Sequence, residues 1–296
     1  MSQVIASRFK KGRSKCVTQA SIDRRIAAGD GQGSKEEYVP WIKVRSIPSR
    51  GTSQIVPGVK IFRTHHFLSK AEYHYFLILE NDESVIDIRE QFPLFPASET
   101  SAIATSQGIK APVFVGTNIP LVMTSDFLVT RVDKDGGSRL VARTLKYAEE
   151  IESAPQSKRD RLLEKLHIER EYWEKRGVEW RLVLYERLSQ NKIKNLIFLR
   201  SYARISPDIA SDKNTRQLVE LVSVSDFSIA PLKAVLGKMS RALFMDYMSV
   251  KRLFFHLVWL GVIKINLEGQ LINLLDPLFV EKTETGISHM RRIANA

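Results

Sequence analysis

Cysteine occurs once in the 296-residue sequence, at Cys16. A single cysteine excludes both a disulfide framework and a cysteine-based zinc site within one chain, and it suits a reducing compartment. Long apolar runs are also absent. The longest begins near residue 253, is interrupted by His256 and is too short to span a bilayer. The N-terminal residues lack the apolar core of a signal peptide. These absences predict a soluble intracellular protein with no membrane partner.

Acidic residues are fewer than basic ones. The chain has 45 Lys and Arg against 33 Asp and Glu, a formal net charge of +12. This balance favours an anionic partner, nucleic acid first and an acidic membrane surface second. Residues 1–50 hold eleven Lys or Arg and four Asp or Glu, a net of +7. The basic arm, residues 1–17, carries Lys10, Lys11 and Arg13, which either contact DNA phosphates or belong to a solvated terminus.

The first two thirds of the chain mix two hydropathy patterns. Alternating apolar residues predict strands at 84–92 and 178–186, whereas amphipathic segments predict helices over 69–82 and 157–177. Residues 18–187 are therefore expected to form an α/β domain, with a mixed sheet flanked by helices.

The pattern changes near residue 187 and becomes mainly helical. The last three predicted helices are followed by residues 262–275, which read as a hairpin around Glu268 and Gly269. Three helices followed by a hairpin are the order of a winged helix, a variant of the helix-turn-helix. We expect residues 188–296 to be this all-helical, winged-helix domain, ending in a flexible tail.

A second hairpin lies at residues 124–150, where two apolar-rich runs flank an Asp-Gly-Gly turn. Pairing the runs about this turn places Asp126 opposite Lys146, and Leu128 opposite Thr144. Directly opposed residues, and residues two apart on one strand, point to the same face. Asp126, Thr144 and Lys146 should therefore share a face at the open end of the hairpin. On spacing alone, a cross-strand salt bridge between Asp126 and Lys146 is the favoured explanation.

A nuclease site is the alternative interpretation of the same hairpin. Carboxylates can hold Mg²⁺ ions that stabilise the attacking and leaving oxygens of a phosphodiester, and a lysine can orient the attacking water. An acid starting one strand and a lysine ending the next is the arrangement of restriction-endonuclease-like nucleases. A further acid is often supplied by a preceding helix, and Glu72 is a candidate. Glu72 also fits a capping box with Ser69, in which it binds the Ser69 backbone N–H.

Four segments extend this interpretation beyond a lone acid and lysine. They resemble the TnsA family, the endonuclease subunits of heteromeric transposases: "GDGQGSKEEYVPW", "RTHHFLSKAEYHYFLILENDESVIDIREQFPL", "MTSDFLV" and "KLHIEREYWEKRGVEW". The resemblance runs from about residue 18 into the C-terminal region and is weaker beyond residue 187. It implies a restriction-endonuclease-like domain followed by a winged helix.

The resemblance also implies roles for individual residues. Glu72 would be the helix acid, Asp126 the central metal ligand and Lys146 the catalytic lysine. The backbone carbonyl of Leu145 would be a further metal ligand. Thr144 occupies a position where the family often has Gln and classical nucleases have Asp or Glu, so it would bind metal directly or through a water. The implied cofactor is Mg²⁺, one ion or two, with Mn²⁺ able to substitute.

Other residues are candidates for binding DNA. Gln91 lies in the family signature and could contact DNA or the edge of the active site, or could have a structural role in closing its strand. His66 is a candidate for a polar contact near the phosphate. In the C-terminal domain, Lys251 and Arg252 are candidates for contacts with the DNA backbone, although the domain has the alternative of docking a partner protein.

The resulting hypothesis is a Mg²⁺-dependent DNA endonuclease of a cut-and-paste transposase complex. The resemblance implies that it cleaves the 5′ strands at transposon ends in double-stranded DNA, beside a TnsB-type transposase and a TnsC-type AAA+ ATPase. It would work in the prokaryotic cytoplasm, at the nucleoid. Two alternatives stay open: a non-catalytic DNA-binding adaptor or regulator, and a stand-alone restriction-like nuclease.

Overall fold

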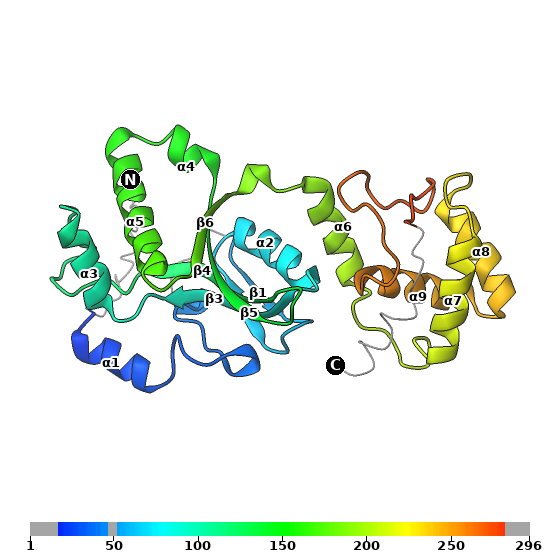
Figure 1. Ribbon diagram of the computed structural model, residues 1–296, viewed down its shortest axis with the longest axis horizontal. Helices are drawn as coiled ribbons and strands as arrows, with labels where there is room; N and C mark the ends of the chain where they lie inside the picture. Colours follow the sequence, from blue (N-terminus) through cyan, green and yellow to red (C-terminus); the bar gives the residue numbers. More distant parts are fainter. Residues whose placement is uncertain (1–16, 47–51, 282–296) are drawn as a thin grey trace, which may run out of the picture.

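The computed structural model describes residues 17–46 and 52–281 (Figure 1). Lys10, Lys11, Arg13 and the tail from residue 282 lie outside these ranges. The described elements occur in this order: α1 (Gln19–Ala27), η1 (Lys35–Glu37), η2 (Val44–Ser46), β1 (Gln54–Pro57), β2 (Thr64–Phe67), α2 (Lys70–Asn81), β3 (Val85–Pro93), α3 (Ala97–Ser106), β4 (Thr124–Val132), β5 (Ser138–Lys146), α4 (Ala148–Glu152), α5 (Gln156–Glu174), β6 (Glu179–Leu184), η3 (Tyr185–Arg187), α6 (Gln190–Arg200), α7 (Asp212–Val224), α8 (Leu232–Leu243) and α9 (Tyr247–Trp259). Among them, no helix has both the length and the apolar character needed to cross a membrane.

The centre of the first domain is a mixed sheet, as the sequence predicts. Across the described chain its strands are ordered β3-β4-β5-β6; the first two pairings are antiparallel, and β5 pairs with β6 in parallel. The parallel pair needs a long crossover, which α4 and α5 supply. Strands β1 and β2 form a separate antiparallel pair. This α/β arrangement is consistent with a restriction-endonuclease-like fold.

Helices cover both faces of the sheet (Figure 1). Phe127 and Val129 of β4 pack in one apolar cluster with α2, β1 and β2. Leu128, which points to the opposite face, packs in another cluster with α3 and α5. Because β4 is buried on both sides, its sequence is nearly continuously apolar over these residues. Burial on this scale stabilises the sheet by roughly 25 cal/mol for each Å² of apolar surface removed from water.

The C-terminal part is a group of helices built around α9. Helix α9 buries Leu253, Phe254 and Leu257 against α6, α7 and α8, and Leu77 of α2 joins this cluster. Arg200 of α6 donates a hydrogen bond to the buried carboxylate of Glu80, at 2.7 Å. Helix α2 is therefore shared: its first turn lies at the sheet, and its last turns pack on the C-terminal helices.

The predicted hairpin at residues 262–275 does not form as a ladder. Within the described residues, one antiparallel bridge joins Ile265 to Val280 instead. The loop between them is held by Asn195 of α6, whose amide donates to the carbonyls of Leu267 and Gln270. These contacts satisfy backbone groups that a tight hairpin would have paired with each other. Helices α7, α8 and α9 precede this longer loop, which takes the place of the predicted hairpin.

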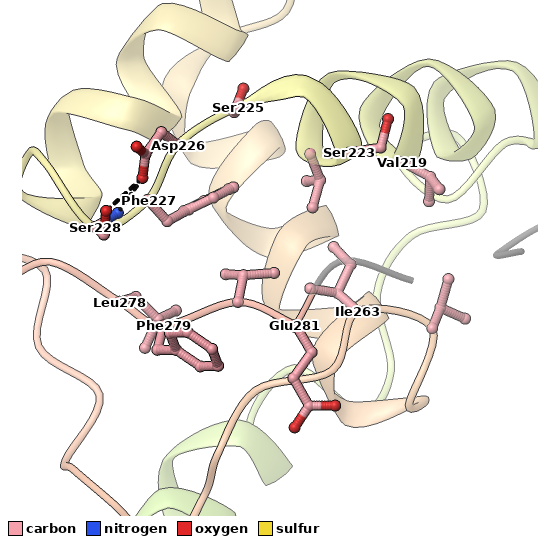
Figure 2. Close-up of a pocket in the computed structure, with 13 residues that line it drawn as sticks. Val219, Ser223, Ser225, Asp226, Phe227, Ser228, Ile263, Leu278, Phe279 and Glu281 are labelled. Atoms are coloured by element: carbon pink, nitrogen blue, oxygen red, sulfur yellow. Dashed lines mark hydrogen bonds between the residues drawn. The ribbon is translucent and has the colours of Figure 1, made fainter. Parts of the chain in front are cut away.

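A groove of about 370 Å³ lies beside this loop (Figure 2). Its lining comes from the end of α7, the segment after it and the chain around Leu278 and Phe279. The Phe279 side chain is 65% exposed. The C-terminal domain thus presents an apolar surface rather than a basic one at this position.

Candidate active site

Glu72 is positioned by the start of α2. Ser69 caps the helix, since its side chain accepts a hydrogen bond from the Glu72 N–H. The Glu72 carboxylate in turn accepts from the Leu68 N–H at 2.8 Å and from the Ser69 hydroxyl at 2.9 Å. It therefore reaches back over the helix N-terminus as a capping residue would, but binds the N–H one residue earlier than the predicted capping box. Gln91 donates to the same carboxylate, which is 6% exposed.

Asp126 and Lys146 meet at the peptide groups around Leu145. The Asp126 carboxylate accepts from the Leu145 N–H at 2.7 Å, and the Lys146 ammonium donates to the Leu145 carbonyl at 2.8 Å. Both residues are described, and no ion pair within 4.0 Å joins them, so the predicted cross-strand salt bridge does not form. The two side chains are brought to the backbone of one residue, Leu145, by hydrogen bonds to the two peptide groups on either side of its Cα.

The hairpin register differs from the prediction by two residues. Phe127 pairs with Arg143, because the turn spans Asp133 to Gly137 and is centred one residue earlier than predicted. Extending this register places Asp126 opposite Thr144 rather than opposite Lys146. A shift of two in the paired numbers keeps every side chain on its predicted face. The acid and the lysine consequently remain at the same end of the hairpin.

Burial and mutual repulsion raise the pKa values of the acids. Burial first, and then the charge of Asp126, raises the pKa of Glu72 to about 8. Burial likewise raises the pKa of Asp126, against the opposing effects of the Lys146 charge and the Leu145 N–H. Burial disfavours the charge of Lys146, but the neighbouring carboxylates, Asp126 foremost, raise its pKa. Two buried carboxyls that disfavour each other's ionisation form a site that a cation would stabilise.

Glu169 is a third acid at this site and is not among the predicted site residues. Its carboxylate, on α5, accepts from the hydroxyls of Ser125 and Thr144, and its side chain is buried. Burial first, with a contribution from the Asp126 charge, raises its pKa to about 7. The sequence does contain a pattern that could have identified Glu169, because it is an acid within the apolar stripe of a helix. It lies three residues after Leu166 on the buried face of α5.

This contact gives Thr144 a partner on α5. The Thr144 hydroxyl is buried and donates to the Glu169 carboxylate. Glu169 therefore brings a carboxylate from a helix to the strand position of Thr144. Binding of a metal by Thr144, directly or through a water, stays a prediction.

Residues 82–184 match a family model described as "TnsA-like endonuclease N terminal". This part of the chain is therefore similar to the N-terminal domain of TnsA-like endonucleases. It is 43% identical over 163 residues to the "Transposon Tn7 transposition protein TnsA" of Escherichia coli. That match covers 55% of this chain and 56% of the relative, so the chain spans about half the length of the curated relative that it matches.

Two carboxylates and one backbone carbonyl at this site provide oxygen atoms of the kind that a divalent cation binds. No group of three His, Cys, Asp or Glu side chains within the described ranges could hold a metal ion. The carboxylates of Glu72 and Asp126 and the Leu145 carbonyl nevertheless form an oxygen donor set. Mg²⁺ prefers such a set and commonly keeps several waters. The Leu145 carbonyl accepts a hydrogen bond from Lys146 and keeps a second lone pair that a metal could use.

The other predicted site residues that the structure describes are His66, Gln91, Lys251 and Arg252. The His66 ring accepts from the Val44 N–H at 3.4 Å. Gln91 is 2% exposed and bound to Glu72, so its side chain is not available for the predicted DNA contact. On α9, Arg252 is exposed and Lys251 is half-buried. These two belong to the C-terminal part of the chain, beyond the residues that match the family model.

Proposed function

We propose that this chain is a metal-dependent DNA endonuclease that cleaves the 5′ strands at transposon ends, as one subunit of a cut-and-paste transposase complex. The observation that carries the proposal is that Asp126 and Lys146 both bind the backbone of Leu145, within the residues that match the TnsA-like family model. Asp126 also lies close enough to Glu72 for its charge to raise the pKa of Glu72. The likeness to a transposition protein of Tn7 supports a transposon-associated endonuclease.

Each side chain has a role in this reaction that follows from its surroundings. Glu72 and Asp126 would hold the cation, because their buried charges need compensation. Bound Mg²⁺, one ion or two, or Mn²⁺ in its place, supplies charge neutralisation at the phosphate and lowers the pKa of a water. The Lys146 ammonium would orient that water and stabilise negative charge developing on the phosphate. Glu169 would position Thr144, and with it the end of β5.

The proposed nucleic-acid partner is double-stranded DNA at the transposon ends. Helices α8 and α9 contain Lys and Arg but no Asp or Glu: Lys233, Lys238, Arg241, Lys251 and Arg252. Such a concentration of positive charge favours the phosphate backbone. It supports DNA contact by the C-terminal domain in addition to the cleavage site.

The proposed protein partners are a TnsB-type transposase, which would cut and join the 3′ ends, and a TnsC-type AAA+ ATPase. Support for a docking role comes from the apolar groove around Phe279 (Figure 2). We propose that the ATPase docks on the C-terminal domain at this groove.

The test compares two single variants of the same hairpin, one at Asp126 and one at the matched acid Asp133. Asp126→Ala should abolish 5′-strand cleavage at transposon ends, assayed with the partner transposase and ATPase present. Asp133→Ala removes an acid in the turn of the hairpin, whose ion pair with Arg139 is partly exposed, and should leave cleavage unchanged. Unchanged cleavage by Asp126→Ala would discard the assignment.

Calorimetry separates the proposed enzyme from the alternatives. The wild type should bind Mn²⁺, and Asp126→Ala should bind it much more weakly. Equal and negligible binding by both would favour a non-catalytic DNA-binding adaptor. Full cleavage by the wild type without partner proteins would instead indicate a stand-alone nuclease.

A further inference from the structure

Gln91 has an unusual backbone for a residue inside a strand. Its φ is 50°, in the left-handed region that glycine and asparagine tolerate best, although it lies within β3. The side chain is 2% exposed, and the backbone carbonyl accepts from the Trp41 N–H at 3.3 Å. A non-glycine residue in this conformation persists only when its surroundings compensate for the strain.

The side chains of β3 change from one face of the sheet to the other at Gln91. Ile88 packs in the cluster on the α2 side of the sheet, whereas Leu94, an even number of residues later, packs on the α5 side. The pairing of β3 with β4 keeps the same register on either side of Gln91, so no residue is inserted. The reversal of alternation therefore occurs at Gln91 itself, through its backbone conformation.

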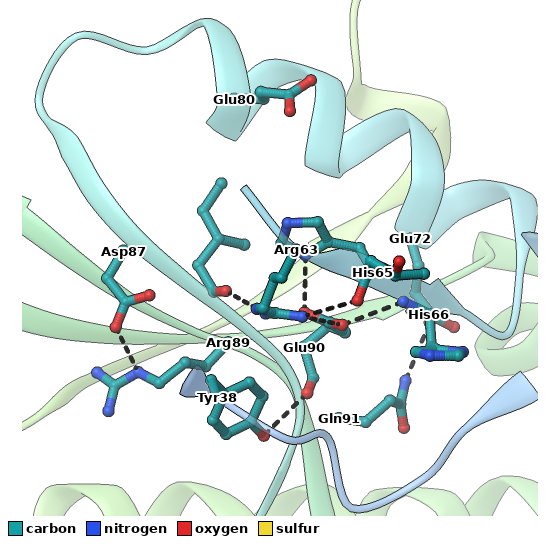
Figure 3. Close-up of polar contacts among 12 residues, drawn as sticks. Tyr38, Arg63, His65, His66, Glu72, Glu80, Asp87, Arg89, Glu90 and Gln91 are labelled. Carbon is teal, nitrogen blue, oxygen red and sulfur yellow. Dashed lines mark hydrogen bonds and ion pairs between the residues drawn. The ribbon is translucent and has the colours of Figure 1, made fainter. Parts of the chain in front are cut away.

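The reversal directs two consecutive side chains to one layer of the protein. Glu90 binds Arg63 and His65 beside β2, and Gln91 binds Glu72 of α2. Both β2 and α2 lie on the same face of the sheet. In a regular strand the two side chains would point to opposite faces. Figure 3 shows the Gln91 amide directed at Glu72, beside the Glu90 contacts.

The Gln91 amide completes the set of donors that fix Glu72. It donates to Oε2 at 3.0 Å, and the Leu68 N–H donates to the same oxygen at 2.8 Å. The Ser69 hydroxyl donates to Oε1. Two of these donors lie in the two residues directly before α2, the helix that carries Glu72. Gln91 is the donor that ties the carboxylate to the sheet on which Asp126 lies.

We propose that Gln91 is a positioning residue that holds the Glu72 carboxylate in the orientation required to bind a divalent cation together with Asp126. This inference rests on the proposed function. The reversal of side-chain alternation at Gln91 brings the amide to Glu72. The contact therefore depends on the strained backbone conformation of Gln91. Partners that orient a metal ligand typically change metal affinity 10- to 100-fold when they are removed.

Two variants separate the amide contact from the backbone conformation. Gln91→Gly suits the positive φ and removes the amide. Gln91→Asn also tolerates this φ, and its amide is one methylene too short to keep the contact at its present length. Both should therefore fold, with melting temperatures within a few degrees of the wild type. Calorimetry on the full chain should show Mn²⁺ affinity reduced about 10-fold or more in each.

The results distinguish this inference from the proposed function. A wild type that binds no Mn²⁺ would overturn both. Wild-type binding with undiminished affinity in both variants would overturn the role of Gln91 alone and leave the nuclease proposal standing. Variants whose melting temperature is much lower, but which bind Mn²⁺ with full affinity while folded, would also overturn the positioning role. They would show that Gln91 only stabilises the fold. A matching loss of 5′-strand cleavage in the complex would support the positioning role.

Discussion

Replacing Glu90 with glutamine should destabilise the protein in a pH-dependent way. The Glu90 carboxylate is fully buried and accepts from Arg63, from the His66 N–H at 3.0 Å and from His65 (Figure 3). Burial alone would raise its pKa, but the hydrogen bonds and charges of Arg63 and His65 lower the pKa to about 2, from an ordinary value of 4.5. The folded state therefore strongly favours the ionised form.

The expected loss of stability follows from the lowered pKa of Glu90. At about 1.4 kcal/mol per pH unit, lowering a pKa from 4.5 to about 2 corresponds to roughly 3 kcal/mol of stability at pH 7. Since the folded pKa is the lower one, this contribution is complete above pH 4.5. It is lost progressively as the pH falls toward 2. Glu90→Gln keeps the shape of the side chain but lacks the charge, so it should lose about 3 kcal/mol at neutral pH.

Urea unfolding of wild type and Glu90→Gln from pH 7 to pH 3 measures this difference. The gap in unfolding free energy should be about 3 kcal/mol at pH 7 and should shrink below pH 4.5. Glu179→Gln is a matched control, because Glu179 pairs with Arg143 at a partly exposed position and should cost less than about 1 kcal/mol. A gap below about 1 kcal/mol, or one that stays constant with pH, would refute the reasoning.

Two further predictions concern the C-terminal domain. Arg200→Met leaves the buried Glu80 carboxylate without its ion pair, so it should cost about 3 kcal/mol and uncouple α2 from α6. Scanning calorimetry should show a lower melting temperature and separated transitions, and one unshifted transition would contradict this coupling. Phe279→Asp changes an exposed side chain, so the unfolding free energy should move by less than about 0.5 kcal/mol. Binding to the ATPase partner, measured by interferometry, should weaken at least 10-fold, and undiminished affinity would remove the groove from the docking surface.

Several features were determined by local sequence patterns. The Asp-Gly-Gly turn and the alternation around it placed Asp126 and Lys146 at the same end of one hairpin, even though the true register differs by two residues. Ser69 marked the start of α2 and so placed Glu72 in its first turn. These predictions hold because capping and strand alternation depend on residues close together in the chain.

Other features were decided by tertiary packing. Glu169 reaches Thr144 only because α5 packs on β5, and the two residues are 25 positions apart. The left-handed backbone of Gln91 leaves no sequence signal, because glycine or asparagine is the residue that such a backbone favours. The predicted wing at residues 262–275 reads as a hairpin, yet Asn195 of a distant helix binds its backbone instead. In each case a hydrogen bond between distant segments outweighs the local preference, and only the folded chain brings those segments together.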